Sequence, residues 1–325
     1  MLTHYKKLRF AVITSSAFTE GGDWRSIYLF VRNLSPSDGS SQLVNLGSKR
    51  SFRQSVALLL LSPTVIVNGL GTSLHWRVIL ACLLRPSIAL YLHETEYMLG
   101  QARQLSPFRF RLFKWIVRRN PLLCVSRQAE ALYRDQYGAT NTHVIYECVD
   151  GSVKLQQFNP SRQHIVMVGS INTRKGVELF SRVADLAGKQ FPDWQFHWVG
   201  GVATMDEIYR SERVLWHGWH WVPGKVVAKC DLFFLSSLDD PCPLAALEAA
   251  NLGKRIVAYR RTGTAEVIDG LPGCRVFESY DENVALEAIS GALGDNGDIA
   301  KRIIEVSRTV SSVEAFAARL ANAVG

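Results

Sequence analysis

The stretch DLFFLSSLDDPCPLAALEAANLGKRIVAYRRTGTAE, residues 231–266, predicts a strand, a helix and a second strand in succession. Residues 232–235 are continuously apolar, as in a parallel strand covered on both faces, and the loop 236–240 follows them. Residues 244–252 are strong helix formers between a proline and a glycine, which favour the start and the end of a helix. Residues 255–260 give the next strand. This succession is typical of an α/β domain with a parallel sheet.

Two carboxylates lie around the start of this helix. Asp240 precedes the helix and Glu248 lies within it. Backbone N–H groups of a first helical turn bind phosphate, and doubly wound sheets bind ligands at the carboxyl ends of their strands. We therefore expect Pro243, Leu244 and Ala245 to lie against a phosphate, with the acids holding hydroxyl groups on either side, as a nucleotide sugar requires. A helix cap is the structural alternative for Asp240, and a solvated surface position is the alternative for Glu248.

This segment resembles the donor-binding signature of the retaining glycosyltransferases of family 4. In that signature an acid, seven residues and a Glu are followed by Ala, a small-residue helix, a Gly, a strand and a Gly-x-x-Glu turn. The matching positions here are Asp240, Glu248, Ala249, Gly253 and 263–266. The resemblance implies that Asp240 holds hydroxyl groups of the donor sugar and Glu248 the ribose diol. The usual first acid of the family is Glu, so the shorter Asp240 puts the usual sugar preference in question.

Residues 164–176, HIVMVGSINTRKG, are similar to the strand, glycine turn and Lys-Gly pair that open the donor domain of the family. Lys175 corresponds to the diphosphate-binding lysine, and Gly169 to the turn glycine. The family commonly has Arg after that glycine, where this chain has Ser170. Either Arg174 substitutes for that arginine, or the phosphate is held with one cation fewer. Such cations would stabilise the charge that develops on the leaving diphosphate.

Two glycine turns give weaker matches to the same family. Residues 214–219 resemble the strand and turn beside the nucleotide base, which makes Gly218 and Trp219 candidates for the base site. A place in the core or an interface is the alternative for this tryptophan. Gly21 and Gly22 correspond to the loop that lies against the donor phosphates, where a side chain would block close approach. A plain tight turn is the alternative for these two glycines.

His93 stands at the end of a predicted buried strand, residues 88–93. Its position matches the family's histidine near the donor sugar, so the resemblance implies a positioning or electrostatic role. A structural histidine is the alternative. Residues 147–150, ECVD, take the place of the family's Asn-Gly-Val-Asp, and we assign this segment only to the connection between domains.

The length of 325 residues and the alternation of strands and helices predict two α/β domains. The resemblance implies the GT-B fold, in which two Rossmann-like domains with parallel sheets face each other across a cleft. We expect an acceptor-side domain at residues 1–158 and a donor domain at 162–325, with the last helix, about 312–323, packing back on the first domain. The six cysteines lack paired spacing, which argues against a zinc site and a disulfide framework and suits a reducing cytosol.

The chain has a formal net charge of +8, and residues 97–129 contain seven basic residues and no acid. In a helix over 108–119, Arg111, Lys114 and Arg118 share one face with Trp115 near its border, as in a helix that rests on anionic lipid. An amphipathic helix packed on its own sheet is an equal alternative. Nucleic acid is a weaker third alternative, because no nucleic-acid motif accompanies the patch.

The residues and the resemblance together predict a retaining, metal-independent glycosyltransferase. Its substrates would be a nucleotide diphosphate sugar and a glycan or lipid-linked glycan acceptor, in surface polysaccharide or lipopolysaccharide synthesis. We expect no cofactor, and no metal-bridged diphosphate because the chain contains no Asp-x-Asp pair. The expected location is the cytoplasm, with peripheral attachment to the inner face of the membrane through the basic helix. Two alternatives are a nucleotide-sugar epimerase and a non-catalytic module that binds sugar nucleotides or membranes.

Overall fold

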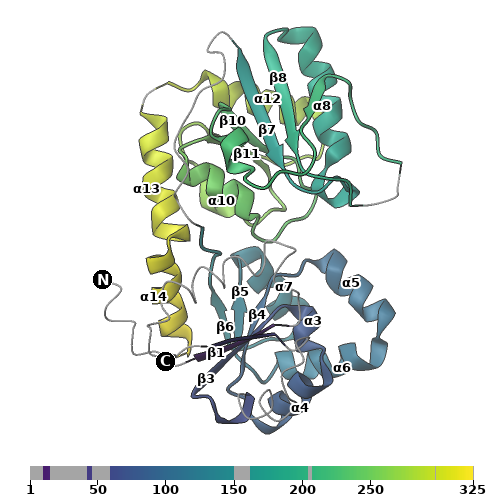
Figure 1. Cartoon of the computed structure of the whole chain (residues 1–325), viewed down its shortest axis with the longest axis vertical. Coiled ribbons are helices and arrows are strands. Elements are labelled where there is room, and N and C mark those ends of the chain that lie inside the picture. Colours follow the sequence, from purple (N-terminus) through teal and green to yellow (C-terminus); the bar gives the residue numbers. More distant parts are fainter. Residues whose placement is uncertain are drawn as a thin grey trace. The chain divides into compact units, whose positions relative to one another are not determined.

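Two parallel sheets form the framework of the protein (Figure 1). The computed structural model describes residues 10–14, 42–45, 59–149, 162–203, 207–296 and 298–324. The chain divides into two units, Met1–Val149 with Ser311–Gly325 and Asp150–Val310, and each holds one sheet. The predicted α/β class with two parallel-sheet domains is therefore confirmed. The predicted end of the first domain, residue 158, lies outside the described residues.

The sheet of the first unit has six parallel strands in the order β2-β1-β3-β4-β5-β6. The strands are β1 Phe10–Thr14, β2 Gln42–Asn45, β3 Thr64–Asn68, β4 Ala89–Leu92, β5 Leu122–Cys124 and β6 Thr142–Val144. Strand β3 ends at Asn68, and His93 directly follows β4. Because neighbouring parallel strands end at the same edge of a sheet, these two side chains come together there.

Several helices lie in the described part of the first unit. They are α3 Leu70–Ser73, α4 Trp76–Leu84, α5 Glu96–Leu105, α6 Pro107–Val117, α7 Arg127–Tyr137 and α14 Val313–Val324. The hydroxyl of Ser126 caps α7 by accepting from Ala129 N at 3.1 Å, and Gly138 ends that helix in the left-handed conformation. Helix α14 belongs to this unit, where Phe316 packs edge-on against Tyr91.

The sheet of the second unit also has six parallel strands, in the order β12-β11-β10-β7-β8-β9. The strands are β7 Gln163–Val168, β8 Trp194–Val199, β9 Val214–Trp216, β10 Leu232–Leu235, β11 Arg255–Tyr259 and β12 Cys274–Phe277. Strand β10 has the predicted bounds and is buried along its whole length. Its apolar residues pack on both faces, as the continuous pattern predicted.

The second unit's helices connect these strands. They are the 3₁₀ turn η2 Thr173–Lys175 and the α-helices α8 Val177–Gln190, α9 Gly224–Val227, α10 Leu244–Asn251, α11 Ala265–Ile268, α12 Glu282–Gly294 and α13 Ile299–Ser311. Helix α10 begins after Pro243, at the predicted position, without a side-chain cap. The alternative interpretation of Asp240 as the cap of this helix is therefore wrong. The carboxylate of Asp240 accepts a hydrogen bond from Lys175 instead.

Two further properties concern the helices and cysteines of the described residues. Within the described ranges, every helix is too short or too polar to pass through a bilayer. All six cysteines lie in the described part of the chain, where they are buried and form no disulfide bond.

Candidate functional site

The loop after β7 holds Lys175 in a fixed turn. Asn172 begins this turn, and its Oδ1 atom accepts a hydrogen bond from Lys175 N at 2.9 Å. Ser170 lies in the same loop, where its hydroxyl accepts from Asn172 Nδ2 at 2.9 Å. Gly176 ends the turn with a φ of +73°, and a Cβ atom there would lie 1.8 Å from Ser236 O. Only glycine fits this position, so Gly176 fixes the backbone next to Lys175.

Lys175 and Arg174 converge on one carboxylate. Lys175 Nζ donates a hydrogen bond to Asp240 Oδ2, and Arg174 Nη1 lies 3.8 Å from the same oxygen. Arg174 Nη1 also donates to Asp239 O at 2.9 Å. Asp240 is only 5% exposed, so the attraction is screened less than that of a surface ion pair. The structure thus brings together three of the predicted donor-binding residues.

Backbone hydrogen bonds tie the loops around this ion pair to one another. Leu238 N donates to Arg174 O at 2.9 Å, which joins the loop after β10 to the loop after β7. Gly263 N donates to Asp240 O at 2.8 Å, which joins the loop after β11 to the loop after β10. The carboxyl ends of three neighbouring strands therefore hold the Asp240 carboxylate in place.

The first turn of α10 follows Asp240 directly. Among the described residues, the first hydrogen bonds within α10 are donated by Ala246 N and Leu247 N, and both are accepted by Pro243 O. Leu244 and Ala245 precede these donors and are half-buried. The N–H groups of a first turn have no intrahelical acceptor, so this turn suits an anion. Glu248 lies one turn further along the same helix and is half-buried.

The glycine loops after β7, β8 and β9 adjoin one another. Gly200 N donates to Gly218 O at 2.8 Å, and a Cβ atom on Gly200 would lie 1.9 Å from Gly169 O. Gly169 and Gly218 therefore lie on either side of Gly200. The side chain of Trp219 is 63% exposed and meets Trp221 edge-on at 4.4 Å between ring centroids. The alternative of a core position for Trp219 is therefore wrong.

A row of three histidines crosses strands β7, β8 and β9, and the sequence did not single it out. His164 Nδ1 lies 3.0 Å from His197 Nε2, and His197 Nδ1 lies 3.0 Å from His217 Nε2. Burial, with the neighbouring His164 and His217, lowers the pKa of His197 to about 3. His197 is therefore uncharged at neutral pH. His164 lies on β7, His197 on β8, and His217 directly follows β9, so the row depends on three strands that the fold places side by side.

In the first unit, His93 lies between two oxygen atoms of other side chains. Its Nδ1 atom is 2.6 Å from Glu147 Oε1, and its Nε2 atom is 2.7 Å from Asn68 Oδ1. The backbone N–H of His93 donates to Glu94 Oε2 at 3.0 Å. Glu94 Oε2 also lies within 3.4 Å of the Tyr133 hydroxyl, and burial together with this carboxylate raises the pKa of Tyr133. Sequence reasoning gave no role to either glutamate.

The basic residues on helix α6 and directly after it differ in their contacts. Arg111 is exposed, and Trp115 is 39% exposed under the guanidinium of Arg119. Lys114 is half-buried with its Nζ atom 5.8 Å from the centre of the Tyr137 ring, and Arg118 Nε donates to Tyr137 O at 2.9 Å. The three predicted cations therefore do not act as one face: Lys114 and Arg118 contact Tyr137 of α7, and Arg111 is exposed.

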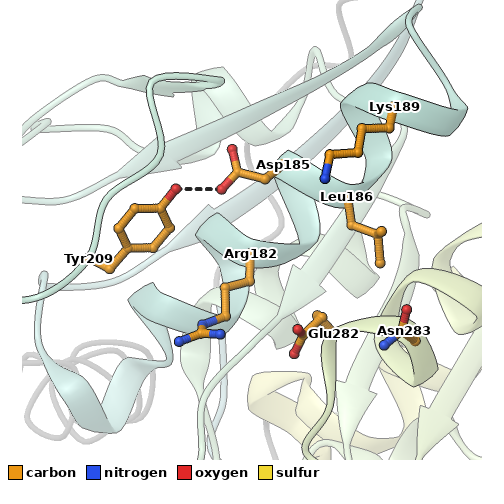
Figure 2. A pocket seen from close by; sticks show the side chains of 7 residues that line it. All are labelled: Arg182, Asp185, Leu186, Lys189, Tyr209, Glu282 and Asn283. Carbon is orange, nitrogen blue, oxygen red and sulfur yellow. Dashed lines mark hydrogen bonds between the residues drawn. The ribbon is translucent and has the colours of Figure 1, made fainter.

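Gly21 and Gly22 lie outside the described residues. A surface pocket of about 390 Å³ lies between α8 and α12 (Figure 2). The predicted site residues are absent from its lining, which consists of Arg182, Asp185, Leu186, Lys189, Tyr209, Glu282 and Asn283. This pocket is therefore separate from the predicted donor site.

Comparison with known proteins finds a family model that is similar to part of the second unit. Residues 162–295 match the family model described as Glycosyl transferases group 1. A comparison with curated proteins found no match.

Among solved structures, Anabaena HepE in complex with UDP and glucose is similar, with a TM-score of 0.72 and 15% identity over 96% of this chain and 98% of that chain. Sucrose-phosphate synthase from Thermosynechococcus elongatus has a TM-score of 0.70 and 16% identity over 97% and 98%. WaaG, a glycosyltransferase involved in lipopolysaccharide biosynthesis, has a TM-score of 0.67 and 13% identity over 97% and 98%. The chain therefore has the GT-B fold of these glycosyltransferases, and residues 162–295 are similar to the family described as Glycosyl transferases group 1.

Proposed function

We propose that this protein transfers a sugar from a nucleotide diphosphate sugar to an acceptor hydroxyl, with retention of the anomeric configuration. The observation that carries the proposal is the convergence of Lys175, Arg174 and Asp240 before the first turn of α10, inside the domain that matches the glycosyltransferase family. Two cations next to a helix start form an environment that favours a diphosphate.

Lys175 and Arg174 would act on the leaving group. As the bond between the sugar and the diphosphate breaks, negative charge grows on the leaving phosphate oxygen. Cations that are already in place stabilise this charge without reorganising. In the present structure both cations are paired with the Asp240 carboxylate. The donor diphosphate would take over this contact when it binds.

Asp240 and Glu248 would then hold hydroxyl groups of the donor. A carboxylate accepts hydrogen bonds from neighbouring hydroxyl groups, and a buried one discriminates strongly against an analogue that lacks them. Asp240 would hold the sugar hydroxyls and Glu248 the ribose diol. Gly169, Ser170 and the half-buried Leu244 and Ala245 would lie along the diphosphate.

Gly218 and Trp219 would lie beside the nucleotide base. The exposed ring of Trp219 offers a face for stacking, and its backbone follows the Gly218 turn. HepE has been solved in complex with UDP-glucose. We therefore take UDP-glucose as the first donor to test.

The retaining step needs no nucleophile from the protein in this proposal. The bond from the anomeric carbon to the phosphate oxygen breaks, and the acceptor oxygen bonds to the same face of that carbon. The acceptor proton passes to the departing phosphate oxygen, so charge and atoms balance. His93 would have a positioning or electrostatic role near the donor sugar.

A lipid-linked acceptor would explain the surface chemistry of the first unit. Helix α4 packs beside α6 and exposes Trp76, Leu80 and Leu84, which lie on one face of the helix. Arg111 and Trp115 add a cation and an aromatic ring from α6. Apolar side chains with arginines suit an anionic membrane surface. We infer a peripheral position on the cytoplasmic face of a membrane, where such acceptors are built.

A donor-turnover assay separates the candidate functions. The protein is incubated with UDP-glucose, with and without a lipid-linked glycan acceptor, and products are identified by mass spectrometry and NMR. A glycosylated acceptor with the α-configuration of the donor supports the proposal. A changed donor without acceptor would indicate an epimerase. Bound but unchanged donor in every condition would indicate a binding module.

A further inference from the structure

Glu147 is a buried carboxylate whose partner in an ion pair is His93. The residue lies in the loop after β6, before Val149, which is where the first segment of the first unit ends. Its side chain is 3% exposed. Its Oε1 atom is 2.6 Å from His93 Nδ1. Its Oε2 atom is buried and accepts no hydrogen bond in the described part of the chain. A buried carboxylate is costly unless a positive group compensates it.

His93 can supply this compensation because oxygen atoms face both of its ring nitrogens. Opposite Glu147, the Nε2 atom lies 2.7 Å from Asn68 Oδ1. A neutral imidazole has one N–H, whereas an imidazolium donates from both nitrogens. Two acceptor oxygens at hydrogen-bond distance therefore match the charged form of the ring.

The other groups packed against His93 agree with a positive charge. Glu94 accepts from the backbone N–H of His93 at 3.0 Å, and this carboxylate is also buried. Tyr91 packs edge-on against the imidazole at 4.4 Å between ring centroids. The Tyr91 hydroxyl is turned away from the ring, because it donates to Ile145 O at 3.0 Å. Two carboxylates thus lie close to His93.

We propose that Glu147 is a positioning residue that fixes the His93 ring and keeps it in the imidazolium form. The first unit then holds an imidazolium, paired with Glu147, at the carboxyl ends of β3 and β4. Its role in turnover rests on the proposed reaction, in which a ring that is already oriented and protonated can donate a hydrogen bond to a substrate oxygen that gains negative charge.

The charge state is measured without any donor. In ¹⁵N NMR of the full-length protein labelled at histidine, the His93 signals are assigned by their loss in His93→Gln. We expect both ring nitrogens of His93 to be protonated at pH 7 and to stay so above the range in which an ordinary histidine titrates. Glu147→Gln keeps a hydrogen-bonding side chain but removes the charge, so its His93 should be neutral at pH 7.

Glu96→Gln is the matched control, because it removes a carboxylate from an exposed position of the same unit. The control should leave the His93 signals unchanged. A neutral His93 in the wild-type protein at pH 7, or a His93 equally charged in Glu147→Gln, would overturn the proposal. Because this readout needs no turnover, it remains decisive even if the proposed reaction is wrong.

Kinetics test the consequence for the reaction. With a working donor and acceptor, Glu147→Gln should lower kcat by about 10- to 100-fold and leave the donor KM nearly unchanged. The folded fraction is checked by the melting temperature, since a purely structural role would reduce the folded protein and not its kcat. Unchanged kcat per folded molecule would overturn the positioning role, whatever the NMR result.

Discussion

Asp240→Asn is expected to tighten the binding of a nucleoside diphosphate and to weaken the protein's preference for the corresponding sugar nucleotide. The change keeps the shape of the side chain and removes its charge. In the structure this charge engages Lys175 Nζ and lies 3.8 Å from Arg174 Nη1. A diphosphate must displace this contact, so its removal frees both cations for the ligand.

The magnitude follows from the geometry. Two unit charges about 4 Å apart attract each other by about 4 kcal/mol at an effective dielectric constant of about 20. The side chains of Lys175 and Arg174 are 16% and 29% exposed, so water recovers part of this energy when the pair separates. A remaining gain of about 1.4 kcal/mol corresponds to tenfold tighter binding. The free energy of unfolding should fall by about 2 kcal/mol, because Lys175 loses its partner.

Isothermal titration calorimetry with UDP and with UDP-glucose measures both effects. In Asp240→Asn, the affinity for UDP-glucose should no longer exceed the affinity for UDP by the amount that the contacts between Asp240 and the sugar hydroxyls contribute. The same change at the adjacent Asp239, whose backbone oxygen contacts Arg174, is the control and should leave both affinities near the wild-type values. If Asp240→Asn binds UDP no more tightly than the wild-type protein, the idea that Asp240 occupies the diphosphate site is refuted.

Three further predictions concern stability and membrane binding. Because the pKa of His197 is about 3 in the folded protein and about 6.5 when unfolded, its contribution to stability is complete above pH 6.5 and is lost as the pH falls toward 3. The free energy of unfolding, measured with denaturant, should therefore fall by about 2 kcal/mol between pH 7 and pH 5 in the wild-type protein. This fall should be smaller in His197→Phe, and an equal pH dependence in the two proteins would contradict the prediction. Gly176→Ala should lower the unfolding free energy by more than about 2 kcal/mol, because its Cβ would meet Ser236 O; an unchanged melting temperature would contradict the described turn. Arg111→Ala combined with Trp76→Ala should reduce sedimentation with anionic liposomes at least about fivefold, while Arg182→Ala in the other unit should not; equal binding by all three proteins would remove the membrane assignment.

The framework of the second unit could be predicted because its signals are local. A continuous apolar run identified β10, and the helix formers between Pro243 and Gly253 identified α10. The strand expected over residues 255–260 is β11, Arg255–Tyr259. The cap at Asp240 failed for a physical reason. A carboxylate before a helix can accept a hydrogen bond from the first helical turn or from a cation that is distant in the sequence. In the structure Asp240 accepts from Lys175, which lies 65 residues away.

Long-range pairs explain the rest of what the sequence missed. Glu147 lies 54 positions after His93, and only the order of strands in the sheet brings the two together. The row from His164 to His217 likewise depends on three strands being neighbours. On α6, helical spacing placed Lys114 and Arg118 on one face but could not show that Tyr137 would draw both toward α7.

The most direct test of the account is donor binding at the site in the second unit. Purified protein is titrated by calorimetry with UDP-, GDP-, dTDP- and ADP-sugars in the absence of added metal, and the measurement is repeated with Lys175→Ala and Glu248→Ala. Lys189→Ala on the exposed surface of α8 serves as the control. The account predicts selective binding of one nucleotide class that both site variants lose and the control retains. Binding that survives in both site variants, or no binding of any sugar nucleotide, would contradict the proposed donor site.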